Sequence, residues 1–315
     1  MTNKAFAAAG RYLPAMPSRF DRAVAVTEAS LSLAWVPVAA TLLSGSQVAR
    51  ALAAEGGGGV TFPFPAGLPT LWTYVSLPSG PAGVGVGGPL SVVLFVPLFL
   101  VGLLVTSALE AGFLGALNDR IDGDPPAFAD GVRRFTLRIV GVNLIRFAVV
   151  LAAAPFLLLG PLAVLVVLVL TYLVYGLPFA VVVRDADLGT ALDETVERAK
   201  AGGEYATFGL THLVAGAVGS FVLSGAVRNL GPVGVVFGTA VVAVPAVIVA
   251  AYGLLLFGDF ERSPRGRSHG SDFGNGPAAD PSSGRERTDR PAVDEFVRDP
   301  PTEDDESDDE RASDQ

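Results

Sequence analysis

The 315-residue chain is half hydrophobic, and only 17% of its residues are charged, whereas about a quarter of the residues are charged in a typical soluble domain. It contains no cysteine, which excludes disulfide bonds, thiol catalysis and zinc–thiolate sites. The net charge of −9 comes from the end of the chain, because residues 259–315 hold 17 acidic and 8 basic residues, while the earlier part holds 14 of each.

Apolar runs divide most of the chain into predicted membrane spans, since a helix of roughly 20 apolar residues crosses about 30 Å of hydrocarbon. The chain is therefore predicted to be an all-α, polytopic transmembrane helical bundle. The predicted spans are 23–49, 89–117, 137–159, 161–183, 205–227 and 233–257. The first is the weakest, because it contains Glu28 and Pro37.

Two short amphipathic helices are predicted on the cytoplasmic side, one between spans two and three and one between spans four and five. In the first, Phe128, Val132, Phe135 and Ile139 share one helical face, and Arg133, Arg134 and Arg138 would reach toward lipid headgroups. The second runs over 188–200, with Asp187 as the N-cap, an exposed pair of Glu194 and Arg198, and Gly202 at its end.

Residues 55–88 are rich in glycine, proline and aromatic residues and almost uncharged. We favour a loop that lies on the outer headgroups, and a re-entrant segment is the alternative. In the fifth span, small residues stand four apart, as Ala215 with Gly219, Gly216 with Ser220 and Ser220 with Ser224, a pattern that permits close helix approach.

The loop arginines and lysines predict the orientation, because positive loops stay in the cytoplasm. They gather before residue 23, in 118–138, in 184–204 and after the last span, whereas only Arg50 and Arg228 lie on the opposite side. We therefore expect a cell-membrane protein with both termini in the cytoplasm: an N-terminal segment 1–22, a six-span domain 23–258 and a disordered acidic tail 259–315.

The order of a span ending in Pro178-Phe179, an acidic turn and a helix with Ala191, Leu192, Thr195 and Gly202 resembles a known pattern. It is similar to the six-span membrane domains related to the membrane region of glycerophosphodiester phosphodiesterases, whose relatives are common in extreme halophiles. Thr195 stands where that family usually has serine. The resemblance implies a fold and no activity, because catalysis in the fused enzymes belongs to a separate soluble domain.

Several ionisable or polar residues lie at similar depth in the predicted spans, about 9–14 Å below the cytoplasmic surface at 1.5 Å per residue. They are Glu28, Glu110, Asn143, Arg146, Tyr175 and His212. Such residues usually face the bundle interior and pair with one another. We favour a structural cluster that holds the helices in register, with an ion pair between Glu110 and Arg146 and with Asn143 one turn away. A substrate or proton pathway is the alternative.

No motif in the chain indicates a catalytic residue, a cofactor-binding residue, a metal ligand or a nucleic-acid partner. We therefore expect a non-enzymatic membrane protein, an accessory or scaffold protein of the envelope whose partners are the bilayer and proteins recruited by the acidic tail. A small transporter or channel is the first alternative, and a lipid-modifying membrane enzyme is the second. The oligomeric state stays open.

Overall fold

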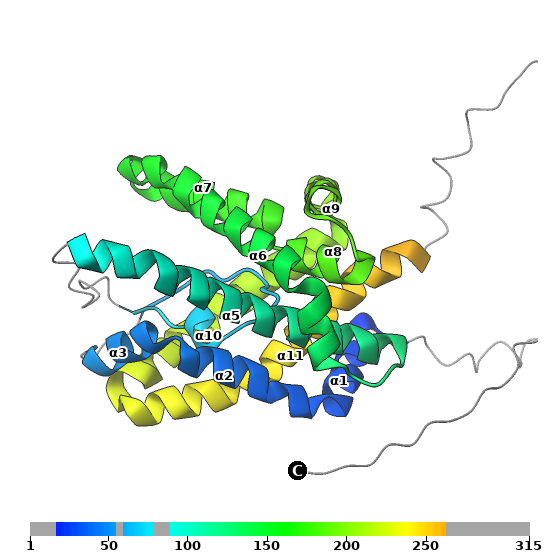
Figure 1. The fold of residues 1–315 in the computed structure, drawn as a ribbon, viewed down its shortest axis with the longest axis horizontal. Helices are drawn as coiled ribbons and strands as arrows, with labels where there is room; N and C mark the ends of the chain where they lie inside the picture. The colour runs from blue at the N-terminus through cyan, green and yellow to red at the C-terminus, as the bar shows by residue number, and fades with distance from the viewer. Residues whose placement is uncertain (1–16, 55–58, 78–88, 263–315) are drawn as a thin grey trace, which may run out of the picture. The chain divides into compact units, whose positions relative to one another are not determined.

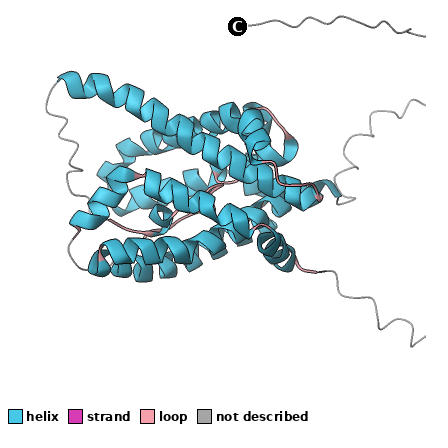
Figure 2. Ribbon diagram, turned by 60° about the horizontal axis from the view of Figure 1, so that its bottom comes forward, coloured by secondary structure: helices cyan, strands magenta, loops and turns pink. Residues whose placement is uncertain are grey.

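The computed structural model describes residues 17–54, 59–77 and 89–262, and in these ranges the chain forms helices and connecting segments without any β-strand (Figure 2). The prediction of an all-α, polytopic bundle is therefore confirmed. Five helices are long and apolar enough to cross a membrane, and a sixth passage is present if one bent pair of helices counts as a span. Most of the predicted acidic tail lies outside the described residues.

The helices follow one another along the chain, and Figure 1 shows how they are arranged. Their bounds are α1 (Arg19–Ala29), η2 (Leu31–Ala34), α2 (Trp35–Leu43), α3 (Gly45–Ala53), α4 (Leu71–Tyr74), α5 (Pro89–Asp122), α6 (Phe128–Ala153), η3 (Ala154–Leu159), α7 (Pro161–Val174), α8 (Leu177–Arg184), α9 (Leu188–Ala201), α10 (Gly203–Leu230) and α11 (Pro232–Arg262).

The first predicted span is not one straight helix. α1 begins inside the predicted N-terminal segment and carries four charged residues, so it is too polar to lie in hydrocarbon. The chain bends by 83° between α1 and the apolar stretch Leu31–Leu43. At 1.5 Å per residue this stretch is only about 20 Å long, and α3 extends it after the break at Ser44. The prediction of a continuous helix over 23–49 is therefore wrong.

No separate amphipathic helix lies between the second and third spans. The expected apolar face, with Phe128 and Phe135, belongs to the first turns of the long helix α6 and packs on α5. The two helices lie in close contact at Gly115 and Gly131, where a Cβ on Gly115 would lie 2.7 Å from Cα of Gly131. Because both positions lack a side chain, the two helices pack along their length after a short turn, and no separate surface helix forms.

The helix between the fourth and fifth spans is confirmed as α9. The Asp187 side chain accepts hydrogen bonds from the backbone N–H groups of Gly189 and Thr190, and Gly202 ends the helix with a positive φ of 69°. The expected pair of Glu194 and Arg198 forms, but it is half-buried rather than exposed, with side-chain exposures of 22% and 10%. The reason is that Arg198 reaches across to α11, where its guanidinium donates to the backbone oxygen of Leu256.

The fourth span is broken between α7 and α8, and a tyrosine from α10 repairs the break. The Tyr205 hydroxyl donates to the backbone oxygen of Tyr172 and accepts from the backbone N–H of Gly176, which are the two groups that an unbroken helix would join directly. Pro178 follows at the start of α8, where proline is tolerated. The Tyr205 side chain therefore ties α10 to the middle of the fourth span.

Residues 59–77 form a re-entrant segment, which is how we name this stretch below. Its side chains from Pro63 to Pro65 are buried, and Gly67 packs on Glu110 and Leu114 of α5. Glu110 lies 21 residues after the start of α5 and 12 before its end, so this contact is inside the bundle. Figure 1 shows the segment in light blue among the helices. The favoured prediction of a loop lying on the outer headgroups is therefore wrong for residues 59–77, and 78–88 lie outside the described residues.

The small residues on one face of α10 pack against the re-entrant segment rather than against another helix. The Ser220 hydroxyl accepts a hydrogen bond from the backbone N–H of Thr61 (2.9 Å), and the Ser224 hydroxyl accepts one from Ser76 (2.8 Å). A Cβ placed on Gly216 would overlap the ring of Pro63, whereas one on Gly219 would meet nothing within 4 Å. The predicted close approach is present on one face of α10, but its partner is an irregular backbone.

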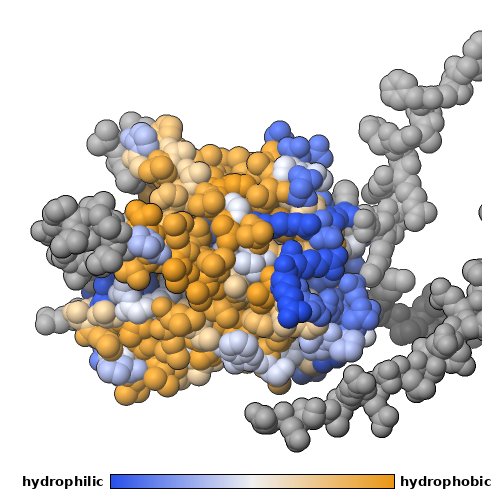
Figure 3. Space-filling model, viewed as in Figure 1, coloured by the Kyte–Doolittle hydropathy of each residue, from blue (hydrophilic) through white to orange (hydrophobic). Residues whose placement is uncertain are grey.

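The surface of the described bundle separates by polarity. Figure 3 shows a broad hydrophobic region over most of the helices and a hydrophilic region at the end where α1, α8 and α9 lie. At this end Arg134 and Arg138 of α6 both pair with Asp185. The hydrogen bond from Arg134, with that from Arg138, holds the pKa of the largely exposed Asp185 below its usual value. This pattern is typical of a bundle embedded in a membrane with a charged rim.

We predict that Gly216→Val destabilises the protein and that Gly219→Val does not. Valine at 216 would displace Pro63 of the re-entrant segment, and overpacking of this kind typically costs about 1–3 kcal/mol. Both glycines lie in the middle of the same helix, so helix propensity affects the two variants equally. Thermal unfolding in detergent measures the difference, and equal melting temperatures for the two variants would contradict the docking of the segment on α10.

Candidate functional site

The main polar site lies between α5 and α6. The Arg146 Nη1 atom donates to Glu110 Oε1 at 3.2 Å and to Asn143 Oδ1 at 3.1 Å. The Asn143 amide donates to Glu110 Oε2 at 3.2 Å and to the Ser107 hydroxyl at 3.0 Å. The structure therefore contains the predicted ion pair, with Asn143 as its bridging group. Glu110 is 5% exposed, so its charge is compensated within the protein.

Helix geometry explains why these four side chains meet. Ser107 and Glu110 stand three residues apart on α5, and Asn143 and Arg146 stand three residues apart on α6, so each pair lies on one helix face. The two helices are antiparallel and joined by a short turn, in which the Asp119 side chain accepts from the backbone N–H of Ala127. This turn sets the register that brings the two faces together.

A cavity of about 360 Å³ adjoins this site. Arg146 and Tyr175 line it from α6 and from the α7–α8 junction, and residues 61–66 of the re-entrant segment form another wall. The Arg146 side chain is 27% exposed, so its guanidinium joins the ion pair on one side and faces the cavity on the other.

Tyr175 belongs to an aromatic group instead of the ion-pair cluster. Its hydroxyl donates to the backbone oxygen of Tyr205 at 2.6 Å, and its ring stacks on Tyr205 with centroids 4.3 Å apart. Phe64 of the re-entrant segment stacks on Tyr175 with ring centroids 5.7 Å apart, and it makes a tilted contact with Tyr172 at 6.2 Å. Tyr175 therefore does not bond the predicted polar cluster, although it lines the same cavity as Arg146.

His212 forms a second, separate polar contact. Its Nε2 atom lies 3.2 Å from the hydroxyl of Tyr74, and the imidazole is 9% exposed. Tyr74 is in α4, so this contact again joins α10 to the re-entrant segment. His212 therefore lies in the bundle interior as predicted, but it contacts neither Glu110 nor Arg146.

Glu28 does not belong to the cluster. It is exposed on α1, and within the described part of the chain it makes no ion pair and no hydrogen bond. The predicted depth of Glu28 assumed a straight first span, whereas the chain bends by 83° directly after α1. The inclusion of Glu28 is therefore wrong.

The re-entrant segment connects the three polar groups that remain. Gly67 packs on Glu110, Phe64 stacks on Tyr175, and Tyr74 contacts His212. Sequence reasoning did not predict these contacts, nor the bond of Ser107 to Asn143 and the bonds of Ser220 and Ser224 to the segment. The available signal was the unusual content of proline and aromatic residues between the first two spans.

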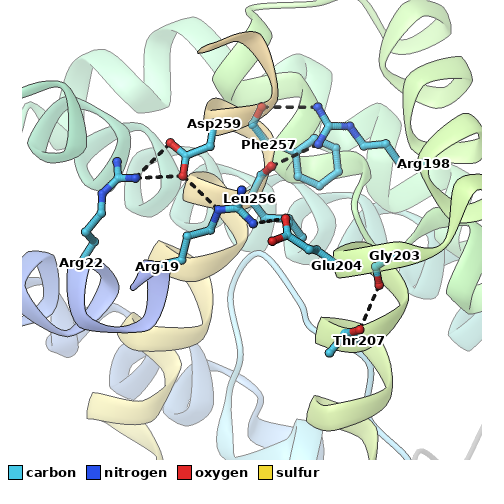
Figure 4. Close-up of polar contacts among 9 residues, drawn as sticks. All are labelled: Arg19, Arg22, Arg198, Gly203, Glu204, Thr207, Leu256, Phe257 and Asp259. Carbon is cyan, nitrogen blue, oxygen red and sulfur yellow. Dashed lines mark hydrogen bonds and ion pairs between the residues drawn. The ribbon is translucent and has the colours of Figure 1, made fainter. Parts of the chain in front are cut away.

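A second charged site closes the hydrophilic end of the bundle, as Figure 4 shows. Arg19 and Arg22 of α1 both pair with Asp259 of α11, and Arg19 also pairs with Glu204 at the start of α10. Beside them the Arg198 guanidinium lies over the Phe257 ring, 4.2 Å from its centroid. These contacts fasten α1, α9, α10 and α11 together, and we call them the end clamp.

No group of three or more metal-ligating side chains is present in the ranges that the structure describes. Comparison of the chain with known protein families, with curated proteins and with solved structures finds no match. The functional argument therefore depends on the geometry of the polar sites and of the re-entrant segment.

We predict that Glu110→Gln and Arg146→Gln each destabilise the protein by about 3–5 kcal/mol, because removing one partner leaves the other charge uncompensated. The double variant should lose much less than the sum of the two, since neither charge remains. Unfolding free energies of the four proteins in one detergent measure this coupling. Additive effects would mean that the two side chains do not interact.

Proposed function

We propose that the chain is a non-catalytic accessory or scaffold protein of the cell envelope, which crosses the cell membrane six times and has both termini in the cytoplasm. The observation that carries the proposal is the burial and pairing of Glu110 within the bundle. Glu110 is buried, its carboxylate bonds Arg146 and Asn143, and the re-entrant segment packs over it at Gly67. Intramembrane charges usually face the bundle interior and pair with one another, and in the proposed role this paired carboxylate holds α5 and α6 in register.

The end clamp supports six passages. Because Arg19 and Arg22 pair with Asp259, the first and the last described helices begin and end at the same end of the bundle. Five passages would leave these helix ends on opposite sides of the membrane, so α2 and α3 supply the sixth. The concentration of arginine at the end that carries the clamp favours the cytoplasm on that side.

The resemblance to the six-span membrane domains related to glycerophosphodiester phosphodiesterases agrees with this proposal. Its firm motif covers α8 and α9, where Thr195 is buried and donates to the backbone oxygen of Ala191. In this proposal the acidic sequence after Arg262 recruits protein partners, while the bundle anchors it to the membrane.

We expect truncation after Arg262 to leave the melting temperature of the bundle unchanged.

A small transporter is the second candidate, and the re-entrant segment favours it. Transporters place irregular backbone at the membrane midplane, where it lines a substrate site. Here residues 61–66 line the cavity beside Arg146, and the fourth span is broken at Gly176 in the same region. A scaffold needs no water in this region, whereas a transporter requires that water reach the ion pair.

We predict that a cysteine at Ser107 stays unreactive toward a water-soluble methanethiosulfonate reagent in inside-out membrane vesicles, whose outer face is the cytoplasmic side of the proposed topology. Ser107 is fully buried beside Asn143, so water does not reach it if the core is closed. The chain has no native cysteine, and Asp124→Cys, at an exposed position in the α5–α6 turn, is the positive control. Reaction of Ser107→Cys would favour the transporter if Glu110→Gln abolishes the reaction. Reaction together with proton flux in liposomes would also favour it.

We further predict that single cysteines at Asp124 and Asn229 react from opposite sides of the membrane. Both positions are exposed, Asp124 in the turn between α5 and α6 and Asn229 in the last turn of α10. In intact cells an impermeant reagent should label Asn229→Cys, and Asp124→Cys should react only after permeabilisation. Labelling of both variants from one side would contradict the proposed topology.

A further inference from the structure

We propose that the cavity between α6, α7 and the re-entrant segment is a binding site for an anionic amphiphile, whose carboxylate or phosphate headgroup bonds Arg146 and whose hydrocarbon chain lies along the apolar wall. This inference does not depend on the scaffold function.

The first support is the unused edge of the Arg146 guanidinium. Both hydrogen bonds of this side chain, to Glu110 and to Asn143, come from Nη1. Within the described residues the Nε and Nη2 atoms donate no hydrogen bond. Their N–H bonds run parallel along one edge of the planar group, and this geometry matches the two oxygens of a carboxylate or a phosphate.

The second support is the position of Glu110 behind this edge. Glu110 and Asn143 hold Nη1 on the protein side and thereby fix the plane of the guanidinium, so the free edge is directed away from them. The positive charge that a bound anion would meet is partly offset by Glu110, which favours reversible binding over permanent occupation. Thr171, whose hydroxyl has no partner among the described side chains or backbone groups, lines the same cavity.

The third support is the composition of the remaining wall. Val149, Val150 and Val174 line the cavity, and Val150 is 62% exposed on the outer surface of the bundle. The cavity therefore has an apolar side that opens toward the hydrocarbon at Val150. A free inorganic anion would leave this side empty, whereas an acyl chain would fill it and gain about 0.8 kcal/mol for each buried methylene group.

The fourth support is the irregular backbone of the re-entrant segment. At membrane depth such a backbone occurs where it is buried in protein or lines a polar cavity. Pro63 and Pro65 bring no N–H group to the cavity wall, and within the described residues the carbonyl groups of residues 62–66 accept no hydrogen bond. A polar headgroup beside residues 62–66 would find acceptors here for a hydroxyl or a protonated oxygen.

The test is binding of radiolabelled palmitate to the full chain in nanodiscs of zwitterionic lipid. Unlabelled palmitate and lysophosphatidate should compete, because both combine an oxyanion with one acyl chain. Methyl palmitate, acetate and inorganic phosphate should not compete at the same concentrations. Equal competition by methyl palmitate would reduce the site to an apolar groove, and equal competition by acetate or phosphate would assign it to a free anion; either result would overturn the proposal.

Two variants connect the binding to the cavity. Val150→Phe narrows the apolar opening without touching the ion pair, and we expect about tenfold weaker palmitate binding, which corresponds to the loss of two methylene contacts. Val164→Phe is the matched control, because Val164 is 52% exposed on α7 and lies outside the cavity. Arg146→Lys keeps the charge beside Glu110 but removes the paired N–H edge, so it should also bind about tenfold more weakly. Unchanged binding by folded Val150→Phe would overturn the proposal.

Discussion

The polar backbone of residues 59–77 is the constraint on which the rest of the bundle depends, because a non-helical segment between membrane helices has to find partners for its N–H and C=O groups. The hydroxyls of Ser220 and Ser224 on α10 and of Thr41 on α2 accept hydrogen bonds from this backbone. Three prolines, at positions 63, 65 and 69, remove further donors. The segment can therefore stay inside the bundle without water at each amide.

This segment also sets the arrangement of the charged and aromatic groups around it. Its Gly67 lies against Glu110, so a larger residue there would push the carboxylate away from Arg146. Its Phe64 extends the stack of Tyr175 and Tyr205, and the Tyr205 hydroxyl replaces the missing helix bond of the fourth span. The segment thus contacts the ion pair, the aromatic stack at the broken span and the cavity beside Arg146.

Hydropathy predicted the spans from 89 to 257, because a helix in hydrocarbon needs an apolar surface all round. The contact of Glu110 with Arg146 could be predicted, because two antiparallel helices joined by a short turn place residues at equal distance from the turn at equal depth. The depth predicted for Glu28 was wrong, because residues cannot be counted along one straight helix across the bend after α1. The re-entrant segment could not be predicted, since few charges and many aromatic residues suit both a headgroup layer and a bundle interior. The small residues of α10 were equally ambiguous, because they permit close packing of either a second helix or an irregular segment.

Hydrogen exchange of the segment's backbone amides, measured in nanodiscs, tests the central claim most directly. The account predicts that the amides of Thr61, Leu71 and Ser76 exchange much more slowly than in an unfolded peptide, because each donates to a hydroxyl inside the bundle. Ser224→Ala should accelerate exchange at Ser76 and leave Leu71 protected. Exchange of all three amides at the rate of a free peptide would contradict the account, because the segment would then lie in the headgroup layer, outside the bundle.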